Sequence, residues 1–237
     1  MRDRAALLLV GLTALLTLPA CGGGEPSLST AARLALRHHA DHATWQDLDP
    51  AHPGTRLLDP RTEVTFVRVP GDPDLLAART ELTVGQWRRY VRDFAGDASV
   101  PTPTDDELPM TLSWNDATRY CQTFGYRLPT GAEWERACRG GLDDDAGPWR
   151  NPTELQQHAW FNLNAGDDRH PVARLAANPF GLFDTLGNVW EWCQDEIGTD
   201  RMLRGGSWFT MPGPKPSLKT QAQPDERNAF YGFRPVR

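Results

Sequence analysis

Hydrophobic and polar residues alternate along residues 63–69, where the sequence reads EVTFVRV. Period-two alternation and β-branched residues predict a half-buried strand, and the Pro70–Gly71 pair predicts a turn at its end. From residue 80 to residue 94 the apolar spacing becomes helical, with Thr83 as the expected N-cap. The apolar positions of this second pattern are Val84, Trp87, Tyr90, Val91 and Phe94.

Two further helices are predicted from their capping signals. Ser113 precedes an apolar run that reaches Phe124 and should end at Gly125. Thr130 is followed three residues later by Glu133, the pattern of a capping box. The helix that Thr130 opens should turn its apolar residues inward and end at a Gly-Gly pair. Those apolar residues are Trp134, Ala137 and Cys138.

The second half of the chain predicts strands and loops. A Gly187–Asn188 turn precedes an alternating run of apolar and polar residues that favours a strand. Residues 203–209 and 231–236 are further strand candidates, and residues 96–109 and 141–180 are loop-like. Short helices among short strands and long loops favour an α+β fold with much irregular backbone.

The first 21 residues have the pattern of an export signal. Arg2 and Arg4 precede an apolar run, residues 5–17, that is too short to span a bilayer. Residues 18–21, LPAC, resemble the lipobox of bacterial lipoproteins, in which Cys21 would be lipidated. That resemblance implies a signal peptide over residues 1–20 and a lipid anchor on the periplasmic or outer face of a bacterial membrane. The alternative is an ordinary secretory signal cleaved after Ala20.

Composition narrows the function classes. The net charge of −6 over 237 residues does not suggest a nucleic-acid partner. Nine Trp, 21 Gly and 20 Pro favour a loop-rich fold held together by aromatic packing. Besides Cys21 the chain has Cys121, Cys138 and Cys193, with no CxxC motif, so neither a disulfide scaffold nor a structural zinc site is indicated.

Four stretches, in this order, resemble the formylglycine-generating enzyme family, also called sulfatase-modifying factor domains. They are residues 112–141, 178–195, 203–208 and 232–237, and they include the distinctive segments GNVWEW and RGGSW. Residues 78–91 match the family's early strand and helix. The resemblance implies an irregular variant of the C-type lectin fold with two helices, short antiparallel strands and long loops. It places a linker at residues 21–60 and the domain at residues 61–237.

The resemblance also implies a cleft and a test for its chemistry. Family enzymes that oxidise cysteine to formylglycine bind copper(I) with two cysteines just after RGGS. This sequence has Thr210 and Lys215 at those positions. A hydroxyl and an ammonium group cannot replace two thiolates, which are the soft ligands that copper(I) prefers. We therefore expect a cleft without a copper centre, formed by Trp190, Ser207, Trp208 and Thr210.

A structural calcium ion is implied at the GNVWEW turn. The family pattern assigns the side chains of Asp184 and Glu191 and the backbone carbonyls of Gly187 and Val189 as ligands. Mixed carboxylate and carbonyl oxygens are ligands that Ca²⁺ prefers. The alternative is that Glu191 simply accepts hydrogen bonds from turn amides. A departure from the family pattern is Gly131, where Glu is usual, and we expect it to weaken the start of its helix.

Three functions follow as hypotheses. The first is a membrane-anchored, non-catalytic binding or structural module with a protein or peptide ligand in the cleft. The second is an oxidative tailoring enzyme with a non-haem iron centre, which needs two histidines and a carboxylate and would have to use His158 and His170. The third is formylglycine generation itself. Cys121 and Cys138 are expected to be buried thiols, with a bond between them as the alternative.

Overall fold

The computed structural model describes residues 45–49, 55–71, 75–95, 105–144 and 147–237. Cys21 and the expected signal peptide lie outside these residues. Within them, no helix has both the length and the apolar character needed to cross a membrane.

The first sheet is antiparallel and has the strand order β1-β2-β3-β4. Its strands are β1 (Gln46–Asp47), β2 (Arg56–Asp59), β3 (Val64–Arg68) and β4 (Leu76–Ala78). Strand β3 lies where alternation predicted a strand, and Val64, Phe66 and Val67 are buried. Strands β1 and β2 precede residue 61, so the folded part includes residues that the sequence placed in the linker.

The helices begin where their caps were expected. Helix α2 (Val84–Tyr90) has a capping box at Thr83 and continues as the π-helical turn η1 (Val91–Ala95). Helix α3 (Trp114–Phe124) begins after Ser113, and helix α4 (Gly131–Arg139) has a capping box of Thr130 and Glu133. Both end at a left-handed glycine, Gly125 or Gly140, as αL-capped helices do. The loop after α4 contains η2 (Pro148–Arg150) and the short helix α5 (Pro152–Leu155), which the sequence did not predict.

The second sheet has the order β7-β6-β5-β8. Its strands are β5 (Trp190–Ile197), β6 (Asp200–Arg204), β7 (Lys219–Ala222) and β8 (Tyr231–Gly232). Strand β8 covers only the first two residues of the strand predicted over residues 231–236. It pairs with β5 in parallel, whereas the resemblance implied antiparallel strands. The predicted strand over residues 203–209 was wrong beyond Arg204, because Gly205 and Gly206 adopt φ of 94° and 77° and turn the chain.

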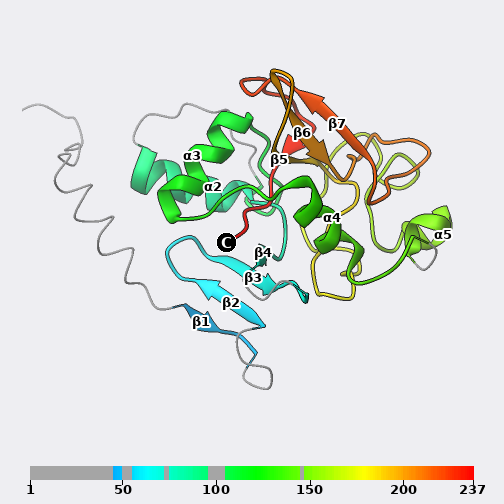
Figure 1. The fold of residues 1–237 in the computed structure, drawn as a ribbon, viewed down its shortest axis with the longest axis horizontal. Helices are drawn as coiled ribbons and strands as arrows, with labels where there is room; N and C mark the ends of the chain where they lie inside the picture. The colour runs from blue at the N-terminus through cyan, green and yellow to red at the C-terminus, as the bar shows by residue number, and fades with distance from the viewer. Residues whose placement is uncertain (1–44, 50–54, 72–74, 96–104, 145–146) are drawn as a thin grey trace, which may run out of the picture.

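The last five residues join the two halves of the fold. Leu76 and Arg237 exchange backbone hydrogen bonds at 2.7 and 2.8 Å, and Arg127 and Val236 do so at 2.9 Å. Figure 1 shows the chain end between the first sheet and the helices. This path carries Arg234 into the interior, where its exposed fraction is 2%.

Three apolar clusters form the core. The largest lies among the helices, where the Tyr120 ring is 5.1 Å from Tyr90, 5.0 Å from Phe124 and 5.7 Å from Phe233. A second cluster packs Val67 and Leu75 of the first sheet region against Leu182 and Val236. The third packs Trp134 and Cys138 of α4 against Phe161 and Cys193. The observed architecture is the α+β class expected from the sequence.

Candidate functional site

The turn after β6 is built from two glycines and a hydroxyl. A Cβ at Gly206 would lie 2.9 Å from both Pro214 Cβ and Thr210 Oγ1, so glycine is needed there for close packing as well as for its positive φ. Thr210 Oγ1 accepts a hydrogen bond from the Ser207 backbone N–H at 2.8 Å, and Thr210 N–H donates to Ser207 O at 3.0 Å. The Thr210 hydroxyl therefore closes the turn as a structural group.

A cleft of about 600 Å³ lies beside this turn. Of the four residues expected in it, Trp190, Ser207 and Thr210 line it. Trp208 packs beside the cleft instead, with its ring 4.8 Å from that of Phe230. The sequence analysis missed four other aromatic residues that line the cleft. Phe209 belongs to the same turn, and Trp149, Phe230 and Tyr231 come from other segments.

The cleft wall exposes large apolar side chains. Phe209 is 63% exposed and Met211 is 68% exposed. Single exposed hydrophobic residues are common, but two that border the same cleft form an apolar surface suited to a ligand. Lys215 is the charged residue that lines the cleft.

The donor set of the cleft does not fit copper(I). Thr210 and Lys215 occupy the two expected thiol positions and both line the cleft. Cys121, Cys138 and Cys193 are free and buried, and none lines the cleft. Cys121 and Cys138 are therefore not bonded to each other. Burial raises the pKa of all three thiols, that of Cys138 to about 12, which disfavours the thiolate forms that bind metals.

Glu191, which was expected to bind calcium, forms a buried ion pair. Its exposed fraction is 1%. Arg234 donates to both of its oxygens, from Nη2 at 2.7 Å and from Nε at 3.1 Å. Trp134 Nε1 also donates to Glu191 Oε2 at 2.7 Å. Two further N–H groups of Arg234 donate to the carbonyl oxygens of Ala78 and Phe183, each at 2.8 Å.

Two more carboxylates face this pair. Glu81 Oε1 and Asp184 Oδ1 are buried, and neither has a hydrogen-bond partner among the described residues. Burial raises the pKa of Glu81 well above its ordinary value, and the negative charges of Asp184 and Glu191 add to the effect. Burial likewise raises the pKa of Asp184 to about 6, although its Oδ2 accepts a hydrogen bond from Ala173 N at 2.7 Å. The sequence did not reveal Glu81, which lies more than 100 positions away along the chain.

The turn between Asp184 and Glu191 contains two residues with positive φ, Gly187 and Asn188. Gly187 has φ of 76°, and a Cβ there would lie 2.0 Å from Trp160 O. Asn188 has φ of 52°, donates from its side chain to Glu81 Oε2 at 3.4 Å, and accepts from His170 N at 2.9 Å. The predicted turn at Gly187–Asn188 is therefore present, and it places Asn188 against Glu81.

A divalent cation is compatible with this cluster in charge and in donor type. Three carboxylates, Glu81, Asp184 and Glu191, surround one guanidinium, which leaves two negative charges unbalanced when all are ionised. The free oxygens of Glu81 and Asp184 are hard ligands. Within the described residues, however, no three His, Cys, Asp or Glu side chains are placed to hold a metal together, and both Glu191 oxygens already accept hydrogen bonds. Binding would therefore rely on Glu81, Asp184 and backbone carbonyls more than on Glu191.

The two histidines considered for an iron centre lie apart from the cleft lining. His170 stacks on Trp160, with ring centroids 3.8 Å apart, and its Nε2 is 2.7 Å from Ala165 O. His158 lines a different cavity, described below. Neither lines the cleft.

The two sheets, the irregular loops and the cleft at the RGGSW turn define a C-type lectin-like domain of the formylglycine-generating type. The chain belongs to the family described as the sulfatase-modifying factor enzyme 1-like domain, whose model matches residues 60–237. It is 30% identical over 236 residues to a formylglycine-generating enzyme of Thermomonospora curvata, covering 82% of this chain and 72% of that one.

Two further similarities were found, one to a curated relative and one to a solved structure. The chain is 43% identical over 149 residues to the inactive C-alpha-formylglycine-generating enzyme 2 of Mus musculus, covering 54% of this chain and 48% of that protein. The structure of PvdO from Pseudomonas aeruginosa superposes with a TM-score of 0.61 at 22% identity, covering 78% of this chain and 98% of PvdO. At this identity, the similarity to PvdO shows only a shared fold.

Proposed function

We propose that this protein is a non-catalytic, lipid-anchored binding module of a bacterial cell envelope, with the cleft as its binding surface. The proposal depends mainly on the hydrogen bond from the Ser207 N–H to the Thr210 hydroxyl, which closes the turn. Copper-binding members of the family have a thiolate at the position of Thr210. The cleft has a volume of about 600 Å³ and an aromatic lining that includes Trp149, Trp190 and Phe230. The relative named inactive supports the idea that family domains persist without the enzymatic activity.

Restoring the two thiols tests the catalytic part of the proposal. The wild-type chain should neither bind copper(I) nor convert the cysteine of a sulfatase-derived peptide to formylglycine. The double variant Thr210→Cys with Lys215→Cys should gain copper(I) binding, because it places two soft ligands in a preserved cleft. The matched control is Thr210→Ser with Lys215→Ser, which should gain none. Peptide conversion by the wild-type chain, measured by mass spectrometry, would refute the proposal.

The ligand of the cleft is proposed to be a protein or peptide segment with apolar side chains and an acidic group. Phe209 and Met211 supply the exposed apolar contact, and Lys215 supplies the charge complement. A phage-displayed peptide library selected on the protein should enrich such segments. The variant Phe209→Ser with Met211→Ser should lose them, whereas a control substitution of the exposed Leu163, which does not line the cleft, should not. If the double variant still selects the same peptides, the ligand binds outside the cleft.

Calcium is proposed as a structural ion at Asp184, with the carbonyls of Gly187 and Val189 and with Glu81 and Glu191 nearby. Its role would be to neutralise the buried carboxylates. A calcium concentration 100 times the Kd should stabilise the fold by about 2.7 kcal/mol, which raises Tm by several degrees. The variant Asp184→Asn should lose most of this response, and Asp225→Asn, an exposed acid outside the cluster, should keep it. An unchanged Tm on addition of calcium or EGTA would argue against the site.

The lipid anchor is proposed at Cys21 from the lipobox alone. When the full chain is expressed in bacteria with a labelled fatty acid, the label should appear on the wild-type protein. It should be absent from Cys21→Ser and present on Cys121→Ala. Labelling of Cys21→Ser would refute the assignment.

A further inference from the structure

A second cavity, of about 280 Å³, borders the cleft, and Trp149 lines both spaces. Its walls come from the end of α4, the η2–α5 segment and the loop of residues 176–186. None of the residues matched to the family's copper chemistry lines it. Its volume lies just below the range of about 300–1,000 Å³ that is usual for drug-sized ligands, so its occupant must be small.

The inner wall of this α4–α5 cavity is preformed. Leu182 and Leu186 are buried, with exposed fractions of 1% and 4%. Asn178 fixes the loop to the end of α4, because its Nδ2 donates to Ala137 O at 2.7 Å and to Cys138 O at 3.1 Å. Its Oδ1 accepts from the backbone N–H groups of Phe180 and Leu182 at 3.0 and 3.1 Å. A wall that is already ordered loses little conformational entropy when a ligand binds.

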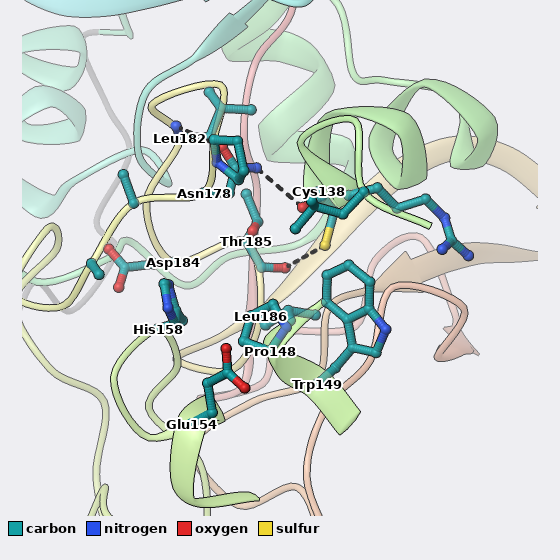
Figure 2. Close-up of a pocket in the computed structure, with 15 residues that line it drawn as sticks. Cys138, Pro148, Trp149, Glu154, His158, Asn178, Leu182, Asp184, Thr185 and Leu186 are labelled. Carbon is teal, nitrogen blue, oxygen red and sulfur yellow. Dashed lines mark hydrogen bonds between the residues drawn. The ribbon is translucent and has the colours of Figure 1, made fainter. Parts of the chain in front are cut away.

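The open side of the cavity carries acceptors. Glu154 and His158 stand four residues apart, at α5 and just after it, and both line the cavity. In the described part of the chain, neither the Glu154 carboxylate nor the His158 imidazole has a hydrogen-bond or ion-pair partner. Figure 2 shows Glu154, His158 and Asp184 along one side, with Trp149 and Cys138 along the other.

The cation that lines the cavity is already paired. Arg139 Nη2 binds Glu135 at 2.7 Å, and its Nη1 binds Asp144 at 2.6 Å. The carboxylates of Glu154 and Asp184 therefore set the charge that a ligand meets. The calcium site proposed above would neutralise Asp184, and Glu154 is then the carboxylate that remains. Trp149 adds an aromatic face, which also attracts a cation.

We propose that the α4–α5 cavity binds a small primary amine with an apolar or aromatic body. The ammonium group is recognised on the side of Glu154 and His158. The apolar body packs against Leu182 and Leu186. This cavity is distinct from the cleft, and Trp149 is the residue that lines both.

Phenethylamine is a suitable probe, with phenethyl alcohol as its neutral analogue and 3-phenylpropionate as its anionic analogue. Titration of the full chain at a fixed calcium concentration, followed by Trp fluorescence and calorimetry, should give a Kd of about 1 mM or lower for the amine. The alcohol should bind at least about 5-fold more weakly and the anion should not bind, because the open side offers a negative charge and acceptors.

Two variants locate the site. Glu154→Gln should weaken amine binding by about 2- to 5-fold and leave binding of the alcohol unchanged, because it removes one charge from an exposed position. Ala177→Phe should weaken binding of both by filling the cavity. Asp225→Asn, an exposed acid that does not line the cavity, is the control. Urea unfolding confirms that each variant is folded. No amine binding below about 10 mM, equal affinity for amine and alcohol, or no effect of Glu154→Gln would each overturn the proposal.

Discussion

The buried pair of Arg234 and Glu191 provides a quantitative test of how this fold is held together. Arg234 makes four hydrogen bonds, two to Glu191 and one each to Ala78 O and Phe183 O, at 2.7–3.1 Å. The variant Arg234→Met removes all four and leaves Glu191 buried beside Glu81 with no cation. Breaking a buried ion pair from one side costs about 3–5 kcal/mol, a large share of the roughly 5–15 kcal/mol that stabilises a domain.

Urea unfolding in the presence of EGTA, followed by Trp fluorescence, measures this loss. With an m-value of about 2 kcal/mol per M, a loss of about 4 kcal/mol lowers the midpoint by about 2 M. The matched control is Arg227→Met, because Arg227 is half-exposed and its partner Asp116, at 2.6 Å, also pairs with Arg119 at 3.5 Å. That pair should contribute no more than about 1 kcal/mol.

A double-mutant cycle separates the pair from its surroundings. Glu191→Gln keeps an acceptor for Trp134 Nε1 but removes the negative charge that Arg234 contacts at 2.7 Å. When both partners are replaced, the double variant should be more stable than the sum of the single effects implies, by about 2 kcal/mol. A loss below about 1 kcal/mol for Arg234→Met, or additive effects in the cycle, would refute the reasoning.

Three further predictions concern the turns and the thiols. Gly187→Ala should lower the free energy of unfolding in urea by about 3 kcal/mol or more, because the added Cβ both strains a left-handed backbone and clashes with Trp160 O. The control Gly181→Ala, with φ of 85° and no atom within 4 Å of the added Cβ, should cost only about 1–2 kcal/mol. Equal losses would contradict the packing argument. Thr210→Val should cost about 1–2 kcal/mol because the buried Ser207 N–H loses its acceptor, and Thr210→Ser should cost less; a stable Thr210→Val would remove the structural role of the hydroxyl. Burial raises the pKa of Cys138 to about 12. At pH 8 this thiol should therefore react with iodoacetamide at least about 100-fold more slowly in the native protein than in urea, as measured by peptide mass spectrometry. Fast labelling of the native protein would show that Cys138 is accessible.

The sequence predicted the elements whose signals are local. Thr83, Ser113 and Thr130 each accept the hydrogen bond expected of an N-cap, because capping depends on residues within one helical turn. The short strands β1, β2, β4 and β7 were missed, since two to four residues cannot show a period. Pairing partners were also beyond local reasoning, as the parallel pair of β5 and β8 shows.

The sequence analysis placed candidate site residues only where the chain matched motifs of the family. Trp190, Ser207 and Thr210 lie in the cleft, but Trp208 packs beside it, because side-chain direction depends on the turn geometry. Glu81 gave no local signal, since its burial depends on long-range contacts with Asn188 and neighbouring acids. The calcium and lipid assignments stay predictions.

Gly131 shows how a departure from a family pattern can have a structural cause. From the sequence we expected a weak helix start. In the structure a Cβ at this position would lie 2.6 Å from Met202 Sδ, and the Gly131 N–H donates to Asp195 Oδ2 at 2.7 Å. The absent side chain lets α4 approach β6 closely, and the carboxylate of Asp195 supplies the negative charge at the helix N-terminus that the family's usual glutamate would have supplied. The same reasoning applies to Thr210, whose hydroxyl holds the turn where a thiolate would bind copper. In both places a local contact accounts for the departure from the family pattern, since Asp195 accepts from the N–H of Gly131 and the Thr210 hydroxyl closes the turn after β6.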